Sequence, residues 1–369
     1  MIDSLHVAGF KLFRDITLPK LGRMNLFVGE NNTGKSCLLE AIGLYAGRSP
    51  IFDVLQTASL RSQDALRPWE VDGPNEEGTP LRHPVFDLFH REGLLNVANP
   101  SPILVEKVGD PNPLHVKFQW HDIVTDDSGL RRYIPVAPGH VTLDHLEFAL
   151  PVYRGDRQVA LVTRRHLPIR NRLLDSDRLP SEDALVVTHV PACGYTEEKA
   201  ASLWDSLIQG PGQDRVLNWL RMLDPRIDDL DYIAGRLNTR IPLLKVEGES
   251  RIPLHSMGDG IRRLFHIGLA MATASKGILL IDEFENGLHW RVQRDLWAAL
   301  GKAALEFDVQ IFATTHSRDC IEGFVSASKE LDISDAKVYR LERKGDEIYA
   351  VDLNLINVEA ALQLNGEIR

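Results

Sequence analysis

The first fifty residues change from the periodicity of strands to that of a helix. The segments SLHVAGFKLF and RDITLPKLG alternate polar and apolar positions and predict a strand hairpin, and MNLFVG predicts a buried strand. The amphipathic segment SCLLEAIGLYAG comes soon afterwards and predicts a helix. Residues 1–48 are therefore expected to form a hairpin, a buried strand, a loop and a helix.

The middle of the chain has a different pattern. Residues 49–75 contain the stretch VDGPNEEGTP and predict a loop-rich transition. From about 102 to 165 the apolar positions recur with period two, in ILVEKV, LHVKFQWHDIV, VTLDHLEFAL and QVALVT, which predicts a β-rich segment. Residues 196–223 have helical spacing that is interrupted at Gly210-Pro211-Gly212, so two helices are expected there.

The last third alternates strands and helices again. Strands are expected at LDYIAGRLN, IPLLKVEG, GILLIDEF, VQIFATTH, AKVYRLER and EIYAVDL. Helices are expected at GIRRLFHIGLAMA, at WRVQRDLWAALGKAALEF and after VQIFATTH. Because α/β material stands at both ends, we expect residues 1–50 and 191–369 to build one α/β domain, with residues 51–190 as a β-rich insertion.

Composition excludes some classes of function. The chain has 369 residues, 44% of them hydrophobic, and a net charge of −10, so it can bury a core but is not expected to coat nucleic acid by charge alone. One basic run, TRRHLPIRNR, contains Arg164, Arg165, Arg170 and Arg172; it predicts either a solvated face or a surface for DNA or an acidic partner. The three cysteines have no metal-ligand spacing.

The ends of the chain carry no membrane or export signal. The first twenty residues lack the basic start and continuous apolar core of a signal peptide, and no apolar run reaches the roughly 20 residues of a membrane helix. A cytoplasmic protein without a membrane partner is expected.

The sequence GENNTGKS has the spacing of a phosphate-binding loop. It lies between the buried strand NLFV and a helix, which is the context that this motif requires. Lys35 is expected to reach the β- and γ-phosphates, and the Ser36 hydroxyl to bind Mg²⁺. Glu30, Asn31 and Asn32 are expected to hold the loop, and Cys37 to pack in the helix. The expected nucleotide-binding set is Gly29, Asn31, Asn32, Thr33, Gly34, Lys35, Ser36 and Cys37.

A second buried strand, in ILLIDEFENG, ends in two carboxylates. Together with the phosphate-binding loop this arrangement predicts that Asp282 binds Mg²⁺ or its waters and that Glu283 is the general base for an attacking water. His316 ends the strand of VQIFATTHS, where it is either a ligand of the γ-phosphate or water, or an ordinary loop residue. The absence of an N-K-x-D motif favours ATP over GTP.

A second glycine loop, SMGDGIRR, opens the longest apolar helix. A serine and two glycines at a helix start offer a hydroxyl, free N–H groups and a positive dipole end, which together favour an anion. The alternative is a simple helix cap in which Ser256 or Asp259 binds the first N–H groups.

The motifs in this order resemble one known family. GENNTGKS, SMGDGIRR, LLIDEFENGLH and FATTHS are similar to the ABC-type ATPase heads of the OLD and AAA15/AAA21 proteins, relatives of the structural-maintenance-of-chromosomes and double-strand-break-repair heads. The likeness covers about residues 1–50 and 185–325. It implies an α/β P-loop fold of the ABC type, with a mixed sheet, an N-terminal antiparallel β-subdomain and a β-rich and helical insertion between the phosphate-binding loop and SMGDGIRR.

The resemblance also implies roles in a homodimer that encloses two ATP molecules. The signature residues Ser256, Gly258, Asp259 and Gly260 would contact the ATP of the other subunit, and His316 would be the switch histidine. The D-loop at the dimer seam would be Asn286, Gly287, Leu288 and His289.

Some features depart from the family pattern. Met257 and Asp259 interleave with the signature residues, so Asp259 needs a cation such as Arg262 or Arg263. Gln63 is a weak candidate for the glutamine loop. No heptads run between the two glycine loops, which excludes long coiled-coil arms.

The metal-binding carboxylates of a Toprim nuclease are not found after FATTHS, so the chain is expected to lack that domain. Resemblance then implies an effector protein in trans, nuclease-like and acting in anti-phage defence, with nucleic acid as a possible ligand. The alternatives are an ATP-dependent scaffold or sensor without catalysis, and the energy subunit of a transporter.

Overall fold

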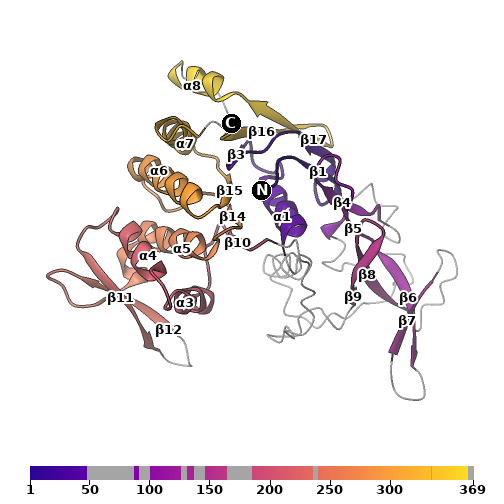
Figure 1. The fold of residues 1–369 in the computed structure, drawn as a ribbon, viewed down its shortest axis with the longest axis horizontal. Coiled ribbons are helices and arrows are strands. Elements are labelled where there is room, and N and C mark those ends of the chain that lie inside the picture. Colours follow the sequence, from indigo (N-terminus) through magenta and orange to yellow (C-terminus); the bar gives the residue numbers. More distant parts are fainter. Residues whose placement is uncertain are drawn as a thin grey trace.

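The computed structural model describes residues 1–47, 87–90, 100–125, 131–136, 146–163, 185–235, 240–333 and 335–364. Three sheets lie within these residues: a six-stranded and largely parallel sheet, an eight-stranded antiparallel sheet, and a small three-stranded sheet. The parallel sheet is central, with most helices on one side and the antiparallel sheet beyond α1 on the other (Figure 1).

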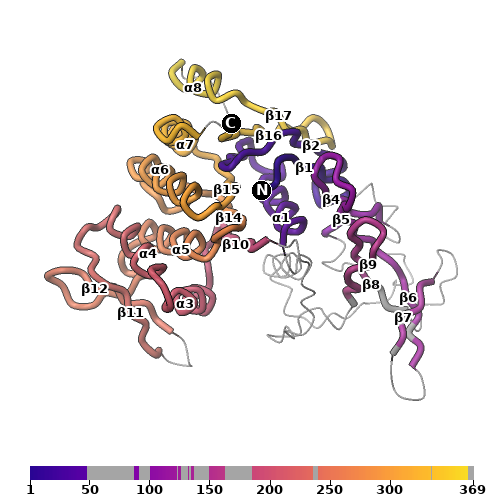
Figure 2. Tube along the Cα trace, in the orientation of Figure 1, coloured from indigo at the N-terminus to yellow at the C-terminus, as the bar shows by residue number. Residues whose placement is uncertain are grey.

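The central sheet joins the two ends of the chain. Its strands, in spatial order, are β10 (Val187–Val190), β14 (Ile278–Ile281), β15 (Gln310–Thr314), β3 (Met24–Val28), β16 (Lys337–Lys344) and β17 (Glu347–Leu353). All neighbours are parallel except β16 and β17. The colours of Figure 2 show the indigo strand β3 among strands of the C-terminal half. The expected single sheet is confirmed.

Both faces of the sheet are buried along its middle strands β3, β14 and β15, which explains why these strands are largely apolar. Ile278 and Leu280 of β14 pack with α1 and the antiparallel sheet, whereas Leu279 and Ile281 pack into the cluster of the other face. The helices are α1 (Lys35–Ala46), α3 (Glu197–Ser206), α4 (Gly212–Leu220), α5 (Asp259–Thr273), α6 (Trp290–Glu306), α7 (Arg318–Glu330) and α8 (Leu355–Gln363).

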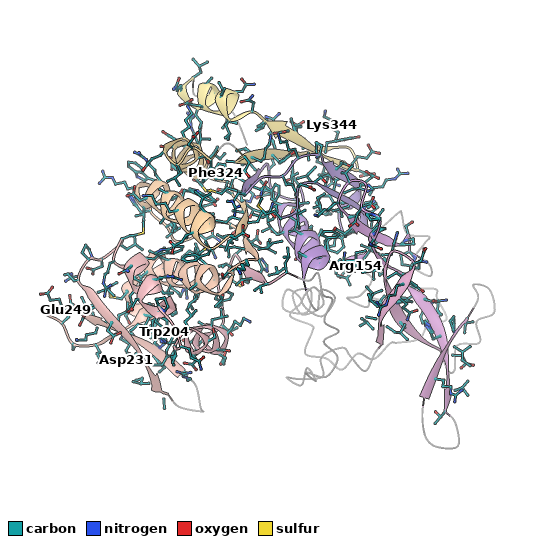
Figure 3. The ribbon with its side chains drawn as sticks, viewed as in Figure 1. Arg154, Trp204, Asp231, Glu249, Phe324 and Lys344 are labelled. Carbon is teal, nitrogen blue, oxygen red and sulfur yellow. The ribbon has the colours of Figure 1, made fainter. Side chains whose placement is uncertain are left out.

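Aromatic side chains fill the layer of helices. The ring of Phe284 stacks on Trp297 of α6 with centroids 4.0 Å apart, and Phe324 of α7 meets the same tryptophan edge-on at 5.0 Å. Trp204 of α3 lies 5.9 Å from Phe265 of α5. Figure 3 labels Trp204 and Phe324 in this layer. Phe284, which directly follows Glu283 in the chain, is therefore held in the core.

The antiparallel sheet combines the N-terminal hairpin with the middle of the chain. Its strands are β1 (Leu5–Phe10), β2 (Phe13–Leu18), β4 (Ile103–Glu106), β5 (Leu114–Val116), β6 (Gln119–Thr125), β7 (Arg131–Pro135), β8 (Leu146–Arg154) and β9 (Arg157–Thr163). Their order is β2-β1-β4-β5-β8-β6-β7, with β9 paired to β8. The proposed division at residues 50 and 190 remains a prediction; β1 pairs with β4 across the first boundary, and β10 joins the central sheet just before the second.

The third sheet directly precedes α5 in the chain and supports its start. Strands β11 (Ile227–Ala234), β12 (Arg240–Val246) and β13 (Ile252–Pro253) form an antiparallel meander, and a 3₁₀ turn, η7 (Leu254–Met257), follows at once. Leu244 and Leu254 are fully or almost fully buried in the same cluster as α5. The loop SMGDGIRR is thus held from behind by packed structure.

Most predicted elements are present, and the differences are local. The helix pair around Gly210-Pro211-Gly212 is confirmed by α3 and α4. Phe13 belongs to the second strand of the hairpin and not the first, because only Lys11 and Leu12 make the turn. The stretch LHVKFQWHDIV splits into β5 and β6. Helix α8 was not predicted from the sequence; Asn354 caps its start through a hydrogen bond from the Ile356 N–H. Among the described residues no helix has the length and apolarity to span a bilayer.

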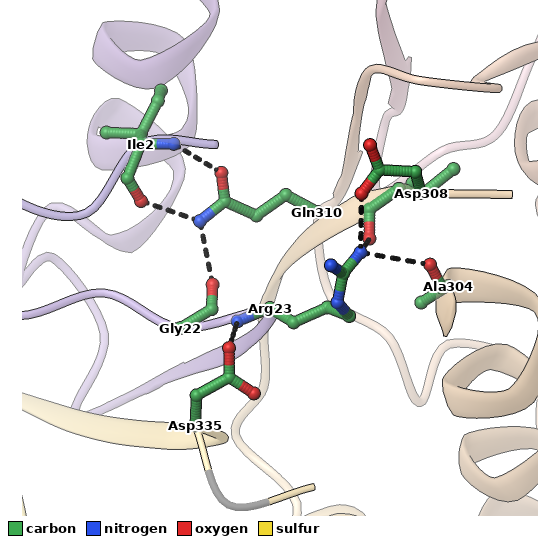
Figure 4. Close-up of polar contacts among 8 residues, drawn as sticks. Ile2, Gly22, Arg23, Ala304, Asp308, Gln310 and Asp335 are labelled. Carbon is green, nitrogen blue, oxygen red and sulfur yellow. Dashed lines mark hydrogen bonds and ion pairs between the residues drawn. The ribbon is translucent and has the colours of Figure 1, made fainter. Parts of the chain in front are cut away.

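Two polar side chains fasten the chain at the amino ends of the central strands. The buried Gln310 side chain accepts a hydrogen bond from the Ile2 N–H at 2.8 Å and donates to the carbonyls of Ile2 and Gly22, each at 2.7 Å (Figure 4). Beside it, Arg23 donates to the Ala304 carbonyl at 3.2 Å. These contacts lie at the opposite end of the strands from the loops that carry the motifs.

We expect Gln310→Leu to lower the free energy of unfolding by about 2 kcal/mol or more, because it leaves the buried N–H and carbonyl of Ile2 without this partner, whereas the Gly22 carbonyl keeps its bond from Asn25 Nδ2. Chemical denaturation measures the change. Asp308→Asn is the matched control, since it removes the charge of an exposed carboxylate at a residue type that tolerates the positive φ of 53°, and it should cost less than about 1 kcal/mol. Equal stability of the two variants would contradict this account.

Candidate functional site

The phosphate-binding loop runs from the end of β3 to the start of α1. Gly29 and Gly34 have φ angles of 142° and 87°, which side chains other than hydrogen rarely permit. A Cβ atom at Gly29 would lie 2.5 Å from the Leu341 carbonyl oxygen, and one at Gly34 would lie 2.8 Å from the Phe13 ring. Conformation and packing therefore both require glycine at the two ends of the loop.

Lys35 folds back over this loop. Its Nζ donates to the carbonyls of Gly29 at 2.9 Å and Glu30 at 2.7 Å. Burial lowers the pKa of Lys35 to about 8, while the carboxylates of Asp282, Glu285 and Glu283 oppose that decrease. Without a ligand, the lysine is thus a desolvated cation whose hydrogen bonds go to main-chain oxygens.

Thr33 and Asn32 contribute to the conformation of the loop. The Thr33 hydroxyl donates to the Glu30 carbonyl at 2.8 Å, and Asn32 has a positive φ of 62°. The side chains of Asn31 and Asn32 are exposed, and the half-buried Cys37 packs against the cluster beneath α1.

The two expected metal ligands come from neighbouring loops and meet. The Ser36 hydroxyl donates to Asp282 Oδ1 at 2.9 Å, and the Thr314 hydroxyl donates to the same oxygen at 2.7 Å. They meet because β15 lies between β14 and β3, so all three loops open at the same edge of the sheet. A hydroxyl and a carboxylate fit Mg²⁺, which keeps few protein ligands and takes its other oxygens from phosphate and water.

Glu283 is held at several points. Its φ angle is 50°, its N–H donates to Thr314 Oγ1 at 2.7 Å, and its Oε2 accepts from Asn286 Nδ2 at 2.6 Å. A residue other than glycine costs about 1 kcal/mol or more in this conformation, so neighbouring groups must hold it. The Asn286 bond turns the carboxylate towards the D-loop.

Glu285 is a site residue that the sequence did not single out. Its carboxylate accepts from the Thr315 hydroxyl and from the His316 N–H, both at 2.7 Å. The loop after β14 thereby fixes the loop after β15, which carries His316. One signal was available in the sequence: Glu285 follows the two carboxylates of the motif by only two residues.

The signature loop is not a side-chain helix cap. Helix α5 begins after Gly258, whose φ is 91°, and no side chain accepts from its first N–H groups. The exposed Ser256 has no hydrogen bond to the described part of the chain, and Asp259 pairs instead with Arg262 at 2.8 Å. The cap interpretation is therefore wrong. Arg262 is the cation beside Asp259, whereas Arg263 points into the protein.

The D-loop packs on this helix start in the same chain. A Cβ atom at Gly260 would come within 2.9 Å of the Gly287 carbonyl oxygen, and one at Gly287 within 3.0 Å of Asp259. Leu288 is buried, and His289 caps α6 by accepting from the Arg291 N–H at 3.4 Å. The structure thus brings the signature, the D-loop and Glu283 together within one chain.

Five predicted residues lie outside the described ranges. They are Gln63 and the basic residues Arg164, Arg165, Arg170 and Arg172.

Comparisons with known proteins agree with this geometry. Residues 207–321 match the family described as AAA ATPase domain. An ATP/GTP phosphatase of Helicobacter pylori is 24% identical over 95% of this chain and 94% of its own length. An OLD nuclease of Thermus scotoductus is 24% identical over 86% of this chain, which spans 59% of that protein.

The fold has a similar solved structure. A structural-maintenance-of-chromosomes head, bound to the C-winged helix domain of ScpA, superposes with a TM-score of 0.51 over 97% of this chain and 99% of that chain, at 13% identity. The chain is therefore similar to ATPases of the OLD and AAA15 kind. The α/β P-loop fold and the ATPase activity expected from the sequence are confirmed.

The lowered pKa of Lys35 gives this ATPase a testable pH dependence. A bound phosphate favours the charged lysine, so binding above about pH 8 requires uptake of a proton. We expect the ATP affinity to be steady just below that pH and to fall above it, by up to tenfold for each further pH unit. Calorimetric titrations in buffers of different ionisation enthalpy measure both quantities. An affinity that stays constant to roughly pH 9.5 without proton uptake would contradict the assignment.

Proposed function

We propose that this ATPase closes head-to-head with a second copy around two ATP molecules, and that the closed dimer controls an effector. The observation that carries the proposal is the presence of two unlike anion sites. One has Lys35 bonded to its loop, with Ser36 and Asp282 bonded to each other beside it. The other, at the start of α5, offers N–H groups that no side chain caps and a Ser256 hydroxyl without a hydrogen bond to the described residues.

Hydrolysis follows from the first site. Lys35 leaves its two carbonyls to bind the β- and γ-phosphates, and Ser36 and Asp282 would hold Mg²⁺, which would supply positive charge against the phosphates. Glu283 accepts a proton from the water that attacks the γ-phosphorus, while the bond to the β-phosphate oxygen breaks. His316, held by Glu285, hydrogen-bonds the γ-phosphate or the water.

The second site supports the dimer. Ser256, Gly258 and Gly260 would bind the γ-phosphate of ATP held by the other copy, and Arg262 balances the charge of Asp259 there. Asn286 to His289, packed on the same helix start, would form the seam. The D-loop would then sense the second copy directly, because Asn286 bonds Glu283.

The effector part of the proposal rests on relatives. The OLD nuclease is similar to this chain over part of its length and is named for a nuclease activity. We therefore propose that the effector is a nuclease-like partner in trans. It would act on nucleic acid, in anti-phage defence, within the cytoplasm.

A sensor with slow turnover is the second candidate. The observation in its favour is the bond from Asn286 to Glu283, because it occupies one oxygen of the carboxylate that would accept the proton. Steady-state turnover with and without DNA separates the two: stimulation supports the regulated hydrolase, and uniformly negligible turnover supports the sensor.

Glu283→Gln should bind ATP with unchanged affinity, hydrolyse it at least about 100-fold more slowly and accumulate dimers, since the amide cannot accept the proton. Turnover assays and light scattering with ATP measure these effects. Lys35→Ala is the control: it should lose ATP binding and remain monomeric. Normal turnover in Glu283→Gln would remove the general-base assignment.

Ser256→Arg tests the site in trans. Ser256 is exposed and has no hydrogen bond to the described residues, so the variant should fold and bind ATP normally. It should nevertheless lose ATP-dependent dimerisation and at least about tenfold in turnover. A substitution at Gly260 would be less informative, because a side chain there collides with Gly287 of the same chain. Unchanged dimerisation of Ser256→Arg would contradict the proposed seam.

A further inference from the structure

Arg263 is a buried cation that belongs to neither anion site. It lies on α5, three residues after Gly260, and is 4% exposed. Its Nη1 donates to the Pro191 carbonyl at 2.7 Å, and its Nη2 donates to the carbonyls of Asp282 at 2.5 Å and Glu283 at 2.8 Å. One guanidinium thus joins α5 to the chain immediately after β10 and β14.

The bond to Glu283 acts on a strained residue. The positive φ of Glu283 must be maintained by its surroundings, and both its N–H and its carbonyl are hydrogen-bonded. Thr314 accepts from its N–H, and Arg263 donates to its carbonyl. The carboxylate itself is left free of Arg263, so this arginine determines where Glu283 stands without contacting the reacting atoms.

The same side chain is rigidly connected to the signature loop. Three residues of helix separate Arg263 from Gly260, about 4.5 Å along the axis. The start of that helix packs closely against the D-loop, since neither Gly260 nor Gly287 has room for a Cβ atom. A shift of α5 therefore moves the carbonyls that Arg263 holds.

We propose that Arg263 is a positioning residue that fixes the main chain of Glu283 for hydrolysis and links it to the signature helix of the same chain. The proposal deepens the proposed function and rests on its assignment of Glu283. Arg263 makes no hydrogen bond to the side chains of Lys35 or Ser36, and it bonds the carbonyl of Asp282 and not its carboxylate, so ATP binding is expected to depend on it less than hydrolysis does.

Single variants separate positioning from general stability. Arg263→Met should lower kcat about 10- to 100-fold with ATP affinity changed less than about twofold, because misplacement of a catalytic group by an ångström has this scale of effect. Arg263→Lys should restore part of kcat, since one ammonium can reach some of the carbonyls. If Arg263→Met does not fold, the kcat of Arg263→Lys is the test: a kcat below that of the wild type supports the proposal, and a wild-type kcat contradicts it.

The matched control is Arg23→Met. Arg23 is also a partly buried arginine that donates to main-chain carbonyls, of Ala304 and Val309, at the far end of the sheet (Figure 4). Its loss should lower the melting temperature and leave kcat unchanged. An equal fall of kcat in Arg23→Met and Arg263→Met, or a normal kcat in Arg263→Met, overturns the proposal.

Mixed dimers show on which chain Arg263 acts. A Glu283→Gln chain paired with a wild-type chain leaves one working site, whose Glu283 is in the wild-type chain. Adding Arg263→Lys to the wild-type chain should reduce the remaining turnover as in the homodimer, whereas adding it to the Glu283→Gln chain should not. The reverse pattern overturns the proposal. If no dimer forms with ATP, the proposed function fails, and the kcat of the single variants still tests Arg263.

Discussion

The hydrogen bonds that converge on Asp282 are the constraint on which the site depends. Ser36 and Thr314 both donate to one oxygen of this carboxylate; Ser36 lies in the first turn of α1, and Thr314 is the last residue of β15. This convergence needs the strand order β14-β15-β3 with all three strands parallel. Residues from opposite ends of the chain meet there because the register of these three buried strands is fixed.

The sequence predicted the parts of this structure that depend on local pattern. Glycines at fixed spacing, an apolar strand before them and a helix behind them define the loop around Lys35 without any tertiary information. The motifs also predicted that Ser36 and Asp282 act together and that Glu283 stands at the end of its strand. The signature glycines were also recognised, but the reason for Gly260 was not: its missing side chain makes room for Gly287 in the same chain, in addition to any role at a partner.

The residues that were missed act through contacts that no sequence spacing specifies. Thr314 and Glu285 bond groups about thirty residues away, and Arg263 bonds main-chain carbonyls, which carry no sequence signature. Arginine next to arginine in SMGDGIRR gave two equivalent candidates for the charge of Asp259. Only the helix phase separates them: Arg262 faces solvent and Arg263 faces the core. Helix α8 was missed because its cap, Asn354, directly follows a strand.

Charge balance connects these contacts to the ligand. Three carboxylates, Asp282, Glu283 and Glu285, act on the two buried cations Lys35 and Arg263, so acidic side chains outnumber basic ones in this cluster. Burial lowers the pKa of both cations, and those carboxylates oppose the effect. A further cation would stabilise a polyphosphate that enters this cluster, and under the proposed function the oxygens of Ser36 and Asp282 would hold it. The proposed function therefore implies that ATP binds together with its metal, and that the carboxylates proposed for hydrolysis oppose binding of the bare nucleotide.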